Sequence, residues 1–253
     1  MEQLPILTIL GPTACGKTTF AAHLAADIDG EIISADSRQV YRRMDIGTGK
    51  DLADYTVDGK EIPYHLIDIA EPGTRYSVYQ FQHDFHEAYT DIKSRGKTPI
   101  LCGGTGLYIE SVIRGYEFDG RVTPSMNSLN IGLKIDREER RRKISARLRS
   151  RLAEGMVDEV RGLIDSGVST AALIRYGLEY KYVTLYLLGE LEYEEMVRLL
   201  EIAIHQFAKR QMTWFRGMEE RRHIPIEWID CTLPVEERIK TVKELWQKQI
   251  AGV

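Results

Sequence analysis

The sequence predicts an α/β fold, in which helices flank a parallel sheet and the C-terminal portion is helical. Three observations predict it. Short apolar runs alternate with helical segments through the first half of the chain, glycine-rich turns follow two of those runs, and the second half has mostly helical periodicity. The runs are nearly uniformly apolar, which is typical of parallel strands buried on both faces.

Turn and cap residues divide the first half into elements. The helix after the first strand places Phe20, Leu24 and Ile28 at a spacing of four, and a later helix can be capped by Ser77 and ended by Gly96. We therefore expect strands over 4–10, 31–35 and 98–102, helices over 18–28, 77–96 and 103–113, and an apolar run over 65–69 that a turn closes at 71–73.

The second half is mostly helical, above all over 137–216. A polar connection over 114–128 leads to an alternating, strand-like segment over 129–135. We expect helices over 137–164 (broken near Gly155), 180–188, 193–215 and 234–250, and a last strand over 226–229. The chain has no internal repeat or low-complexity linker, so we expect one domain over residues 1–253.

Composition excludes several classes of protein. The 253 residues are 43% hydrophobic, enough for a large core, so a disordered chain is excluded. Cys15, Cys102 and Cys231 lie far apart, which fits a reducing compartment better than a disulfide framework or a zinc ribbon. There is no basic leader and no run of about 18 apolar residues, so we expect a cytoplasmic protein without a membrane span. With a net charge of −4, a nucleic-acid partner would need a local basic site.

Residues 11–18 form a phosphate-binding loop by their spacing. They are Gly11, Pro12, Thr13, Ala14, Cys15, Gly16, Lys17 and Thr18, which match G-x-x-x-x-G-K-[ST] between a predicted strand and a predicted helix. In such a loop the backbone N–H groups face an anion, Lys17 supplies a mobile charge and Thr18 offers a hydroxyl to Mg²⁺. The fold is thus expected to be of the P-loop NTPase or kinase type. The motif does not choose between ATP hydrolysis, phosphoryl transfer and holding a diphosphate.

Two further polar residues follow predicted strands. Asp36 ends the second strand, where its carboxylate should face the phosphate loop and could take a proton or hold Mg²⁺ through water. The alternative is a cap for the next helix. Thr105, in the string GGTGLY, offers a hydroxyl at a helix N-terminus, although structural packing explains such a string equally well.

Basic residues gather in two helical segments. Lys209 and Arg216 are seven residues apart and share a helix face with aromatic neighbours, which suits phosphate contacts, although a solvated stripe is the better interpretation from composition alone. Residues 137–151 hold eight Lys and Arg and read as a solvated face, with an RNA-facing patch as the alternative. His83 and His86 lie three apart on a predicted helix, but no third metal ligand is apparent.

Five strings, in order, resemble the tRNA dimethylallyltransferases, also called tRNA isopentenyltransferases. The strings are GPTACGKT (11–18), ISADSRQVYRRMDIGTGK (33–50), YHLIDI (64–69), CGGTGLYI (102–109) and AKRQMTWFR (208–216). The resemblance implies a P-loop kinase-like fold that transfers a dimethylallyl group from dimethylallyl diphosphate to N6 of the adenosine 3′ of the tRNA anticodon, with Mg²⁺, releasing diphosphate.

The resemblance also implies roles for individual residues. Asp36 matches the general base, and the catalytic residues Lys17 and Thr18, the latter through a nearby Mg²⁺, would stabilise the charge of the departing diphosphate. Thr105 would line the channel in which donor and flipped base meet. The loop over 11–18 and Arg210 would hold the diphosphate, with Mg²⁺ near Thr18. The tRNA would be contacted by Asp36, Ser37, Arg38, Gln39 and Lys209. A monomer is expected.

The sequence departs from the family pattern in two places. Family members carry a helical insertion that clamps the anticodon stem, whereas here the connection over 114–128 is too short for a helical hairpin. The family's Gly-Tyr-basic string corresponds to residues 177–181 with extra residues inside it. Three alternatives therefore stay open: an adenylate (AMP, ADP or ATP) isopentenyltransferase, a nucleotide or small-molecule kinase, and a non-catalytic RNA-binding relative.

Overall fold

The computed structural model describes residues 5–118, 121–122 and 125–251, so Leu4 of the first predicted strand and part of the predicted 114–128 connection lie outside it. The strands are β1 (Ile6–Leu10), β2 (Gly30–Ala35), β3 (Thr56–Val57), β4 (Lys60–Glu61), β5 (Tyr64–His65), β6 (Thr98–Gly103), β7 (Glu117–Phe118), β8 (Arg121–Val122), β9 (Ser128–Lys134) and β10 (Glu227–Asp230). The helices are α1 (Lys17–Ile28), the 3₁₀ turn η1 (Leu52–Tyr55), α2 (Val78–Ser94), α3 (Gly106–Arg114), α4 (Arg137–Ala153), α5 (Met156–Asp165), α6 (Thr170–Tyr176), α7 (Leu178–Leu187), α8 (Tyr193–Arg222) and α9 (Val235–Ala251).

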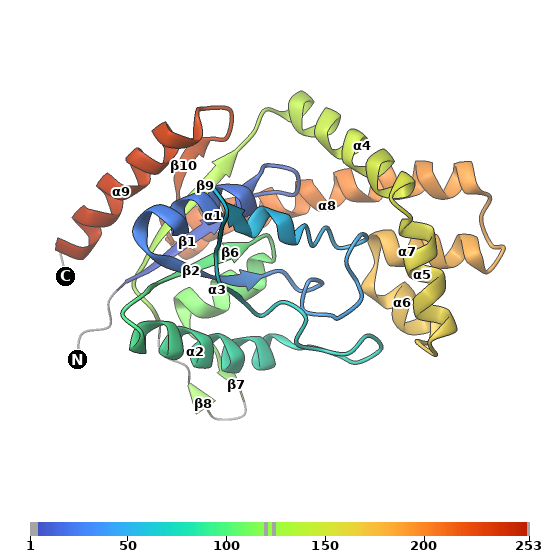
Figure 1. Cartoon of the computed structure of the whole chain (residues 1–253), viewed down its shortest axis with the longest axis horizontal. Helices are drawn as coiled ribbons and strands as arrows, with labels where there is room; N and C mark the ends of the chain where they lie inside the picture. Colours follow the sequence, from blue (N-terminus) through green and yellow to red (C-terminus); the bar gives the residue numbers. More distant parts are fainter. Residues whose placement is uncertain (1–4, 119–120, 123–124, 252–253) are drawn as a thin grey trace.

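The central sheet is parallel, as predicted. Its strand order is β10-β9-β1-β6-β2-β5, and Ile9 of β1 lies opposite Cys102 of β6 and Ile131 of β9. Helices α1 and α9 cover one face, while α2, α3 and the second half of α8 cover the other (Figure 1). Every residue of β1 and β2 is buried, which explains why their sequences are mostly apolar; Thr8, Glu31 and Ser34 are the buried polar exceptions. The predicted P-loop kinase-like α/β class is confirmed.

A third apolar cluster holds together a helical lobe beside the sheet. Side chains of α4 to α7 pack there on the first half of α8, around Met196, Leu200 and Ile204. The same helix then reaches the sheet core through Phe215 and Met218. In Figure 1 the lobe lies at the end of the molecule away from both termini. Because α8 belongs to both clusters, it fixes the lobe against the sheet.

Most predicted elements are present, with some differences in extent. The capping box of Ser77 and Gln80 starts α2, and Gly155, at φ 101°, separates α4 from α5 as expected. Of the apolar run over 65–69 only His65 joins the sheet, because Leu66 and Asp68 take left-handed conformations (φ 64° and 57°) that turn the chain away. Helix α6 was not predicted, and α8 extends beyond residue 215 to Arg222.

The two ends of the connection between α3 and β9 lie next to each other. The N–H of Met126 donates to the carbonyl of Ile113 at 3.0 Å, and β7 pairs with β8 in an antiparallel hairpin between them. The excursion is thus closed at its base by a backbone hydrogen bond. None of the helices among the described residues is both long and apolar enough to cross a membrane.

Candidate active site at the carboxyl edge of the sheet

The phosphate loop connects β1 to α1 and is shaped by its small residues. Ala14 and Gly16 are left-handed (φ 64° and 76°), which turns successive backbone N–H groups toward one side. A Cβ at Gly11 would lie 2.8 Å from Cys15 Sγ, so only glycine fits there. Lys17 Nζ lies 3.4 Å from the carbonyl oxygen of Pro12, and its side chain therefore folds back over the loop.

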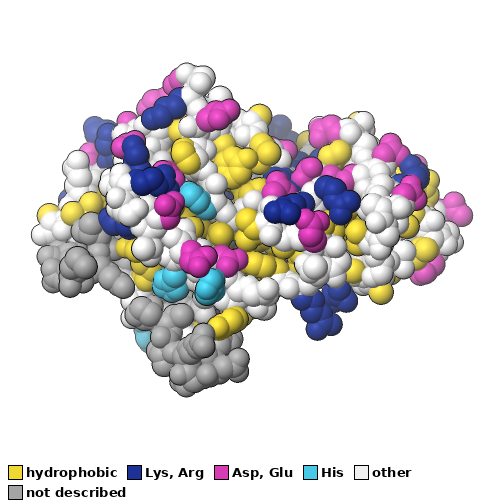
Figure 2. Space-filling view, turned by 60° about the horizontal axis from the view of Figure 1, so that its bottom comes forward, with side chains coloured by type: hydrophobic (Ala, Val, Ile, Leu, Met, Phe, Trp, Pro, Cys, Tyr) yellow, Lys and Arg dark blue, Asp and Glu magenta, His cyan; other side chains and the backbone are white. Residues whose placement is uncertain are grey.

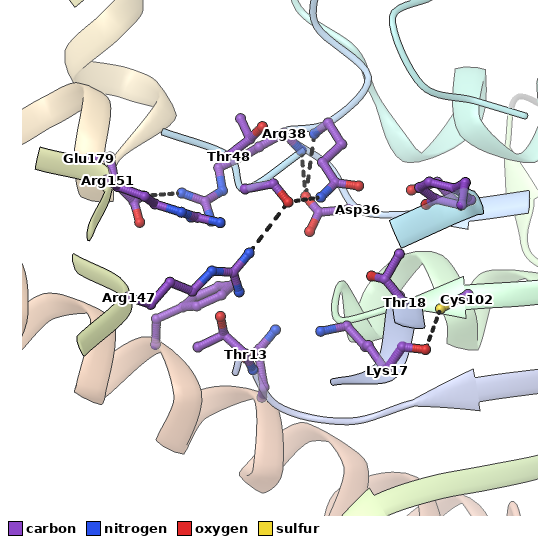
Figure 3. A pocket seen from close by; sticks show the side chains of 17 residues that line it. Thr13, Lys17, Thr18, Asp36, Arg38, Thr48, Cys102, Arg147, Arg151 and Glu179 are labelled. Carbon is purple, nitrogen blue, oxygen red and sulfur yellow. Dashed lines mark hydrogen bonds and ion pairs between the residues drawn. The ribbon is translucent and has the colours of Figure 1, made fainter. Parts of the chain in front are cut away.

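Asp36 follows β2 and borders the same cavity as Lys17 and Thr18 (Figure 3). Its Oδ1 accepts from the N–H groups of Arg38 (3.0 Å) and Gln39 (3.4 Å). The carboxylate therefore caps a turn at residues 37–40. Asp36 is therefore held by its backbone neighbours as a turn cap while it also borders the cavity.

The cavity lies where the sheet and the helical lobe meet. Side chains from the loop, the strand ends, the segment after β2 and helices α4, α7 and α8 border it: Thr13, Lys17, Thr18, Ser34, Asp36, Arg38, Gln39, Thr48, Gly49, Tyr55, Cys102, Gly103, Arg147, Arg151, Glu179, Phe207 and Gln211. Four of these carry positive charge and two carry negative charge. Burial raises the pKa of Cys15 above its usual value and that of Cys102 to about 12, so both remain thiols.

Arg38, predicted to contact tRNA, is paired within the protein. Its guanidinium donates to Glu179 of α7 at 2.5 Å, and the two side chains are 15% and 7% exposed. Burial lowers the pKa of Arg38, but Glu179 and Asp36 outweigh it and hold that pKa above the usual value. The predicted 177–181 string therefore reaches the site through Glu179, while Tyr180 is buried in the lobe and donates to Glu159.

Thr105 and Ser37 hold each other. The Ser37 N–H donates to Thr105 Oγ1 at 3.0 Å, and the Thr105 N–H donates to the Ala35 carbonyl at 3.1 Å. Neither side chain borders the cavity. In the structure they join the segments after β2 and β6, and Gln39 similarly donates to the Gly49 carbonyl at 3.1 Å.

Gln211 was not singled out from the sequence, although it lies in the predicted AKRQMTWFR string. Its Oε1 accepts from the Thr13 N–H at 2.8 Å, and its Nε2 donates to the Gly104 carbonyl at 2.9 Å. The side chain is buried and links α8, the phosphate loop and the glycine pair after β6. A neutral amide gives no charge signal, so only its position beside Arg210 could have drawn attention to it. Arg147 and Arg151 were noted only as part of a basic helix.

Lys209 and Arg210 border a different cavity from Lys17. This hollow, of about 540 Å³, is bordered by Gln206, Lys209, Arg210, Thr213, Trp214, Arg221 and Arg222. Phe207 contacts one arginine from each site: the guanidinium carbons of Arg38 and Arg210 lie 5.6 and 6.0 Å from its ring centroid. The structure therefore brings Arg210 near the phosphate-loop cavity but does not place it on that cavity's wall.

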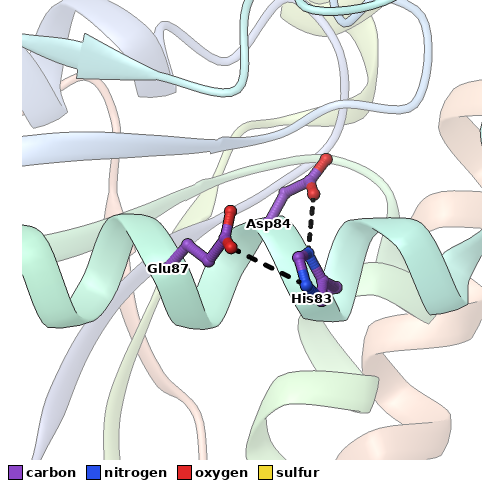
Figure 4. A group of neighbouring side chains, drawn as sticks. All are labelled: His83, Asp84 and Glu87. Carbon is purple, nitrogen blue, oxygen red and sulfur yellow. Dashed lines mark hydrogen bonds and ion pairs between the residues drawn. The ribbon is translucent and has the colours of Figure 1, made fainter.

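A second group of potential metal ligands lies on α2. His83 Nδ1 is 3.2 Å from Asp84 Oδ1, and His83 Nε2 is 3.7 Å from Glu87 Oε1 (Figure 4). The group contains His83 but not His86, the other histidine considered from the sequence, and its further members are Asp84 and Glu87. Histidines adjoin acidic side chains on this exposed face (Figure 2). The two ring nitrogens of His83 therefore approach different carboxylates on this exposed helix face, far from the phosphate loop in sequence.

Comparisons with known proteins agree with the resemblance. A family model described as IPP transferase matches residues 39–128 and 120–218, and one described as isopentenyl transferase matches residues 4–62. The tRNA dimethylallyltransferase 1 of Parabacteroides distasonis is 54% identical over 99% of this chain and 100% of its own length. The tRNA dimethylallyltransferase 2 of Bacteroides fragilis is 49% identical, over 96% of this chain and 98% of its own.

A solved structure gives the same answer for the fold. The full-length tRNA isopentenylpyrophosphate transferase of Bacillus halodurans is 29% identical, with a TM-score of 0.83 over 99% of this chain and 98% of its own.

The comparison with the Parabacteroides protein runs over 308 aligned positions, 55 more than this chain has residues. On these matches, together with the phosphate loop and Asp36 in one cavity, the chain belongs to the family of the tRNA dimethylallyltransferases.

Proposed function

We propose that this protein transfers a dimethylallyl group from dimethylallyl diphosphate to N6 of the adenosine 3′ of the anticodon in tRNA. The observation that carries the proposal is the shared cavity of the phosphate loop and Asp36, because the reaction needs a diphosphate site and a base together. The loop N–H groups and Lys17 hold the diphosphate. As the C–O bond breaks, the bonding electrons leave with the diphosphate, and these groups stabilise the charge.

Asp36 acts as the general base. The N6 amine of adenine is a weak nucleophile, and loss of its proton to a carboxylate as the C–N bond forms lowers the barrier. The two backbone hydrogen bonds to Asp36 Oδ1 fix the carboxylate for this transfer. Thr105 accepts a hydrogen bond from the N–H of Ser37, the residue that follows Asp36. We therefore assign Thr105 and Ser37 a positioning role rather than contact with the reacting atoms.

Mg²⁺ is part of the proposal. The hydroxyl of Thr18 and the carboxylate of Asp36, through water, would hold it, since both border the cavity and both are oxygen donors. When bound, the ion supplies positive charge to the departing diphosphate.

The RNA would be held largely by the catalytic core. The hollow around Trp214 combines an aromatic surface with the cations Lys209, Arg210, Arg221 and Arg222, which suits stacked bases and phosphates. The target adenosine must leave its stack to reach Asp36. Lys209 belongs to this RNA surface, and Arg210, near Phe207, can serve either ligand.

We infer that the family's anticodon clamp is missing at residues 114–128. Two observations support this placement: the two stretches matched by the IPP transferase model meet at residues 120–128, and the Met126–Ile113 hydrogen bond closes the connection at its base. An insertion there could be lost without moving the sheet. Loss of the clamp predicts weak, salt-sensitive RNA binding. We also propose that the protein is a monomer and acts in the cytoplasm.

An acceptor competition tests the proposal. The protein is incubated with dimethylallyl diphosphate, Mg²⁺ and equal concentrations of an anticodon stem-loop with adenosine 3′ of the anticodon, AMP and ATP. We expect N6-isopentenyladenosine in the RNA and release of diphosphate, by mass spectrometry of nucleosides. Product on AMP or ATP alone would support the adenylate alternative, ATP turnover without the prenyl donor would support a kinase, and no product with several RNAs would refute prenyl transfer.

A further inference from the structure

The segment between β2 and η1 leaves the sheet and packs on the helical lobe (Figure 1). Its Met44 side chain belongs to the buried apolar cluster of the lobe. The turn at the end of the segment, residues 45–50, brings Thr48 and Gly49 to the wall of the phosphate-loop cavity. In Figure 3, Thr48 lies on the same side of that cavity as Asp36. Part of the wall of the candidate active site is therefore carried by the lobe and not by the sheet.

Glu159 of α5 holds the 45–50 turn by its backbone. The Oε2 atom of Glu159 accepts from the N–H groups of Asp45 (2.8 Å) and Ile46 (2.6 Å), and its Oε1 accepts from the Gly47 N–H (3.0 Å). Successive backbone N–H groups that converge on one point form a site for an anion, and here a side chain of the protein supplies that anion. Because hydrogen bonds to a carboxylate are stronger than neutral ones, a single side chain fixes three consecutive residues of the turn.

The carboxylate of Glu159 is itself held in place from α7. The hydroxyl of Tyr180 donates to Glu159 Oε1 at 2.7 Å, and the Tyr180 side chain is fully buried. A Cβ at Gly47 would lie 2.8 Å from that hydroxyl oxygen, so the turn approaches the ring as closely as only glycine allows. Each carboxylate oxygen therefore accepts two hydrogen bonds, and the side chain has one defined position.

Lys50 closes the other end of the turn. Its side chain is 1% exposed, and its Nζ donates to the Tyr41 carbonyl at 2.9 Å, to Asp45 Oδ1 at 2.6 Å and to Asp68 Oδ1 at 2.5 Å. An ammonium group has three N–H donors, so these three acceptors use all of them. Both ends of the turn are thus fixed by charged groups whose partners lie within the protein.

The turn is connected to Asp36 through Gln39. The Gln39 Nε2 donates to the Gly49 carbonyl at 3.1 Å, and the Gln39 N–H donates to Asp36 Oδ1 at 3.4 Å. A displacement of the turn would therefore change the orientation of the Asp36 carboxylate. The phosphate loop has a separate support, because its Thr13 N–H donates to Gln211 of α8.

We propose that Glu159 is a positioning residue for prenyl transfer, which fixes the 45–50 turn and, through Gln39, the orientation of Asp36. The inference deepens the proposed function and rests on it for the identity of the reaction. The helical lobe thereby gains a role of its own: α5 and α7 place the general base, while the phosphate loop holds the donor. Loss of the Glu159 charge should slow the chemical step more than it weakens donor binding, because a small displacement of a reacting group is costly.

The test removes the charge of Glu159 and compares a matched control. Glu159→Gln keeps the size of the side chain but replaces one acceptor oxygen with an amide nitrogen, which cannot accept from a backbone N–H. Glu194→Gln makes the same change at an exposed position in the first turn of α8, in the same lobe. The measurements are kcat and the donor KM for prenyl transfer, the melting temperature, and amide hydrogen exchange of the peptide that contains residues 45–47.

Glu159→Gln is expected to separate kcat from KM. We expect its kcat to fall about 10- to 100-fold and its donor KM to stay within about threefold, with faster amide exchange at residues 45–47. Glu194→Gln should stay within about twofold of wild type in both kinetic constants. A folded Glu159→Gln that matches Glu194→Gln in kcat overturns the inference even if its melting temperature falls, because a merely structural role lowers stability and not the rate of the folded enzyme. A donor KM that rises as much as kcat falls also overturns it.

Two further arms keep the inference testable. If Glu159→Gln does not fold, Tyr180→Phe removes only the hydroxyl bond to Glu159 and should lower kcat about two- to fivefold at an unchanged donor KM. An unchanged kcat in Tyr180→Phe then overturns the inference. If wild type makes no prenylated product, the proposed function fails, and amide exchange alone decides whether Glu159 fixes the turn. Faster exchange at residues 45–47 in Glu159→Gln but not in Glu194→Gln supports this, and equal exchange in both overturns it.

Discussion

Two groups of charged side chains at opposite edges of the parallel sheet are paired to different degrees. At the amino edge, Glu31 at the start of β2 is 4% exposed and fully engaged: both terminal nitrogens of Arg95 donate to it, and His65 Nε2 lies at 2.8 Å. At the carboxyl edge, Arg147 and Arg151 share one oxygen of Asp51 at more than 3.2 Å.

The number of hydrogen bonds that a charged group makes within the protein distinguishes a charge that stabilises the fold from one that can bind a ligand. A buried ion with all its hydrogen bonds made within the protein stabilises the fold, and its loss leaves partners uncompensated. A charged group whose donors are mostly unused within the protein can instead pair with a ligand. Substitution of Glu31 should therefore change stability and leave activity intact, while removal of the charge of Arg147 or Arg151 should affect activity more than stability.

Asp36→Asn is expected to have the largest effect. The amide keeps an oxygen for the N–H groups of Arg38 and Gln39 but cannot accept the N6 proton, so kcat should fall about 10²- to 10⁴-fold with little change in melting temperature. Single-turnover prenyl transfer measures it. Asp58→Asn, at an exposed left-handed turn position, is the control. A variant that keeps more than about a tenth of wild-type kcat would show that Asp36 is only a turn cap.

Gln211→Leu is expected to come next and to affect both properties. It leaves the Thr13 N–H and the Gly104 carbonyl without their partner, which should cost about 1–3 kcal/mol of unfolding free energy. The displaced loop should also reduce kcat/KM for the donor about 10- to 100-fold. Urea unfolding and steady-state kinetics measure the two effects. Normal kinetics in a destabilised variant would contradict the positioning role, and Gln247→Leu on the exposed side of α9 controls for the added apolar surface.

These cases show which features can be predicted from sequence. The phosphate loop and Asp36 were predictable because a short local string fixes their geometry: two left-handed residues in one case, a strand end and a turn in the other. The parallel sheet followed from its apolar runs for the same reason.

The other wall of the cavity is built by long-range packing. Gln211 meets Thr13 across 198 positions of sequence, and Arg38 meets Glu179 across 141. No periodicity records such contacts. Arg151 looked like one more cation in a solvated helix because its burial depends on Asp51 and Gly49, about 100 residues earlier. The separation of Arg210 from Lys17 is likewise set by the rotation of α8, which a motif does not specify.

Glu31→Gln should have the smallest effect on activity and a clear effect on stability. Burial raises the pKa of Glu31, but Arg95 and His65 outweigh it and hold that pKa below its usual value. A carboxyl of this kind stabilises the fold above its unfolded pKa, about 4.3, and loses that contribution as the pH falls through its folded pKa. The variant should therefore lose about 1–3 kcal/mol at pH 7, and the difference from wild type should shrink below about pH 4. Asp91→Asn, which removes only the 60%-exposed partner of Arg95, should cost less than about 0.5 kcal/mol. A stability difference that is independent of pH would show that Glu31 acts by packing. A loss of prenyl transfer in the folded variant would contradict the expectation that Glu31 contributes to stability and not to activity.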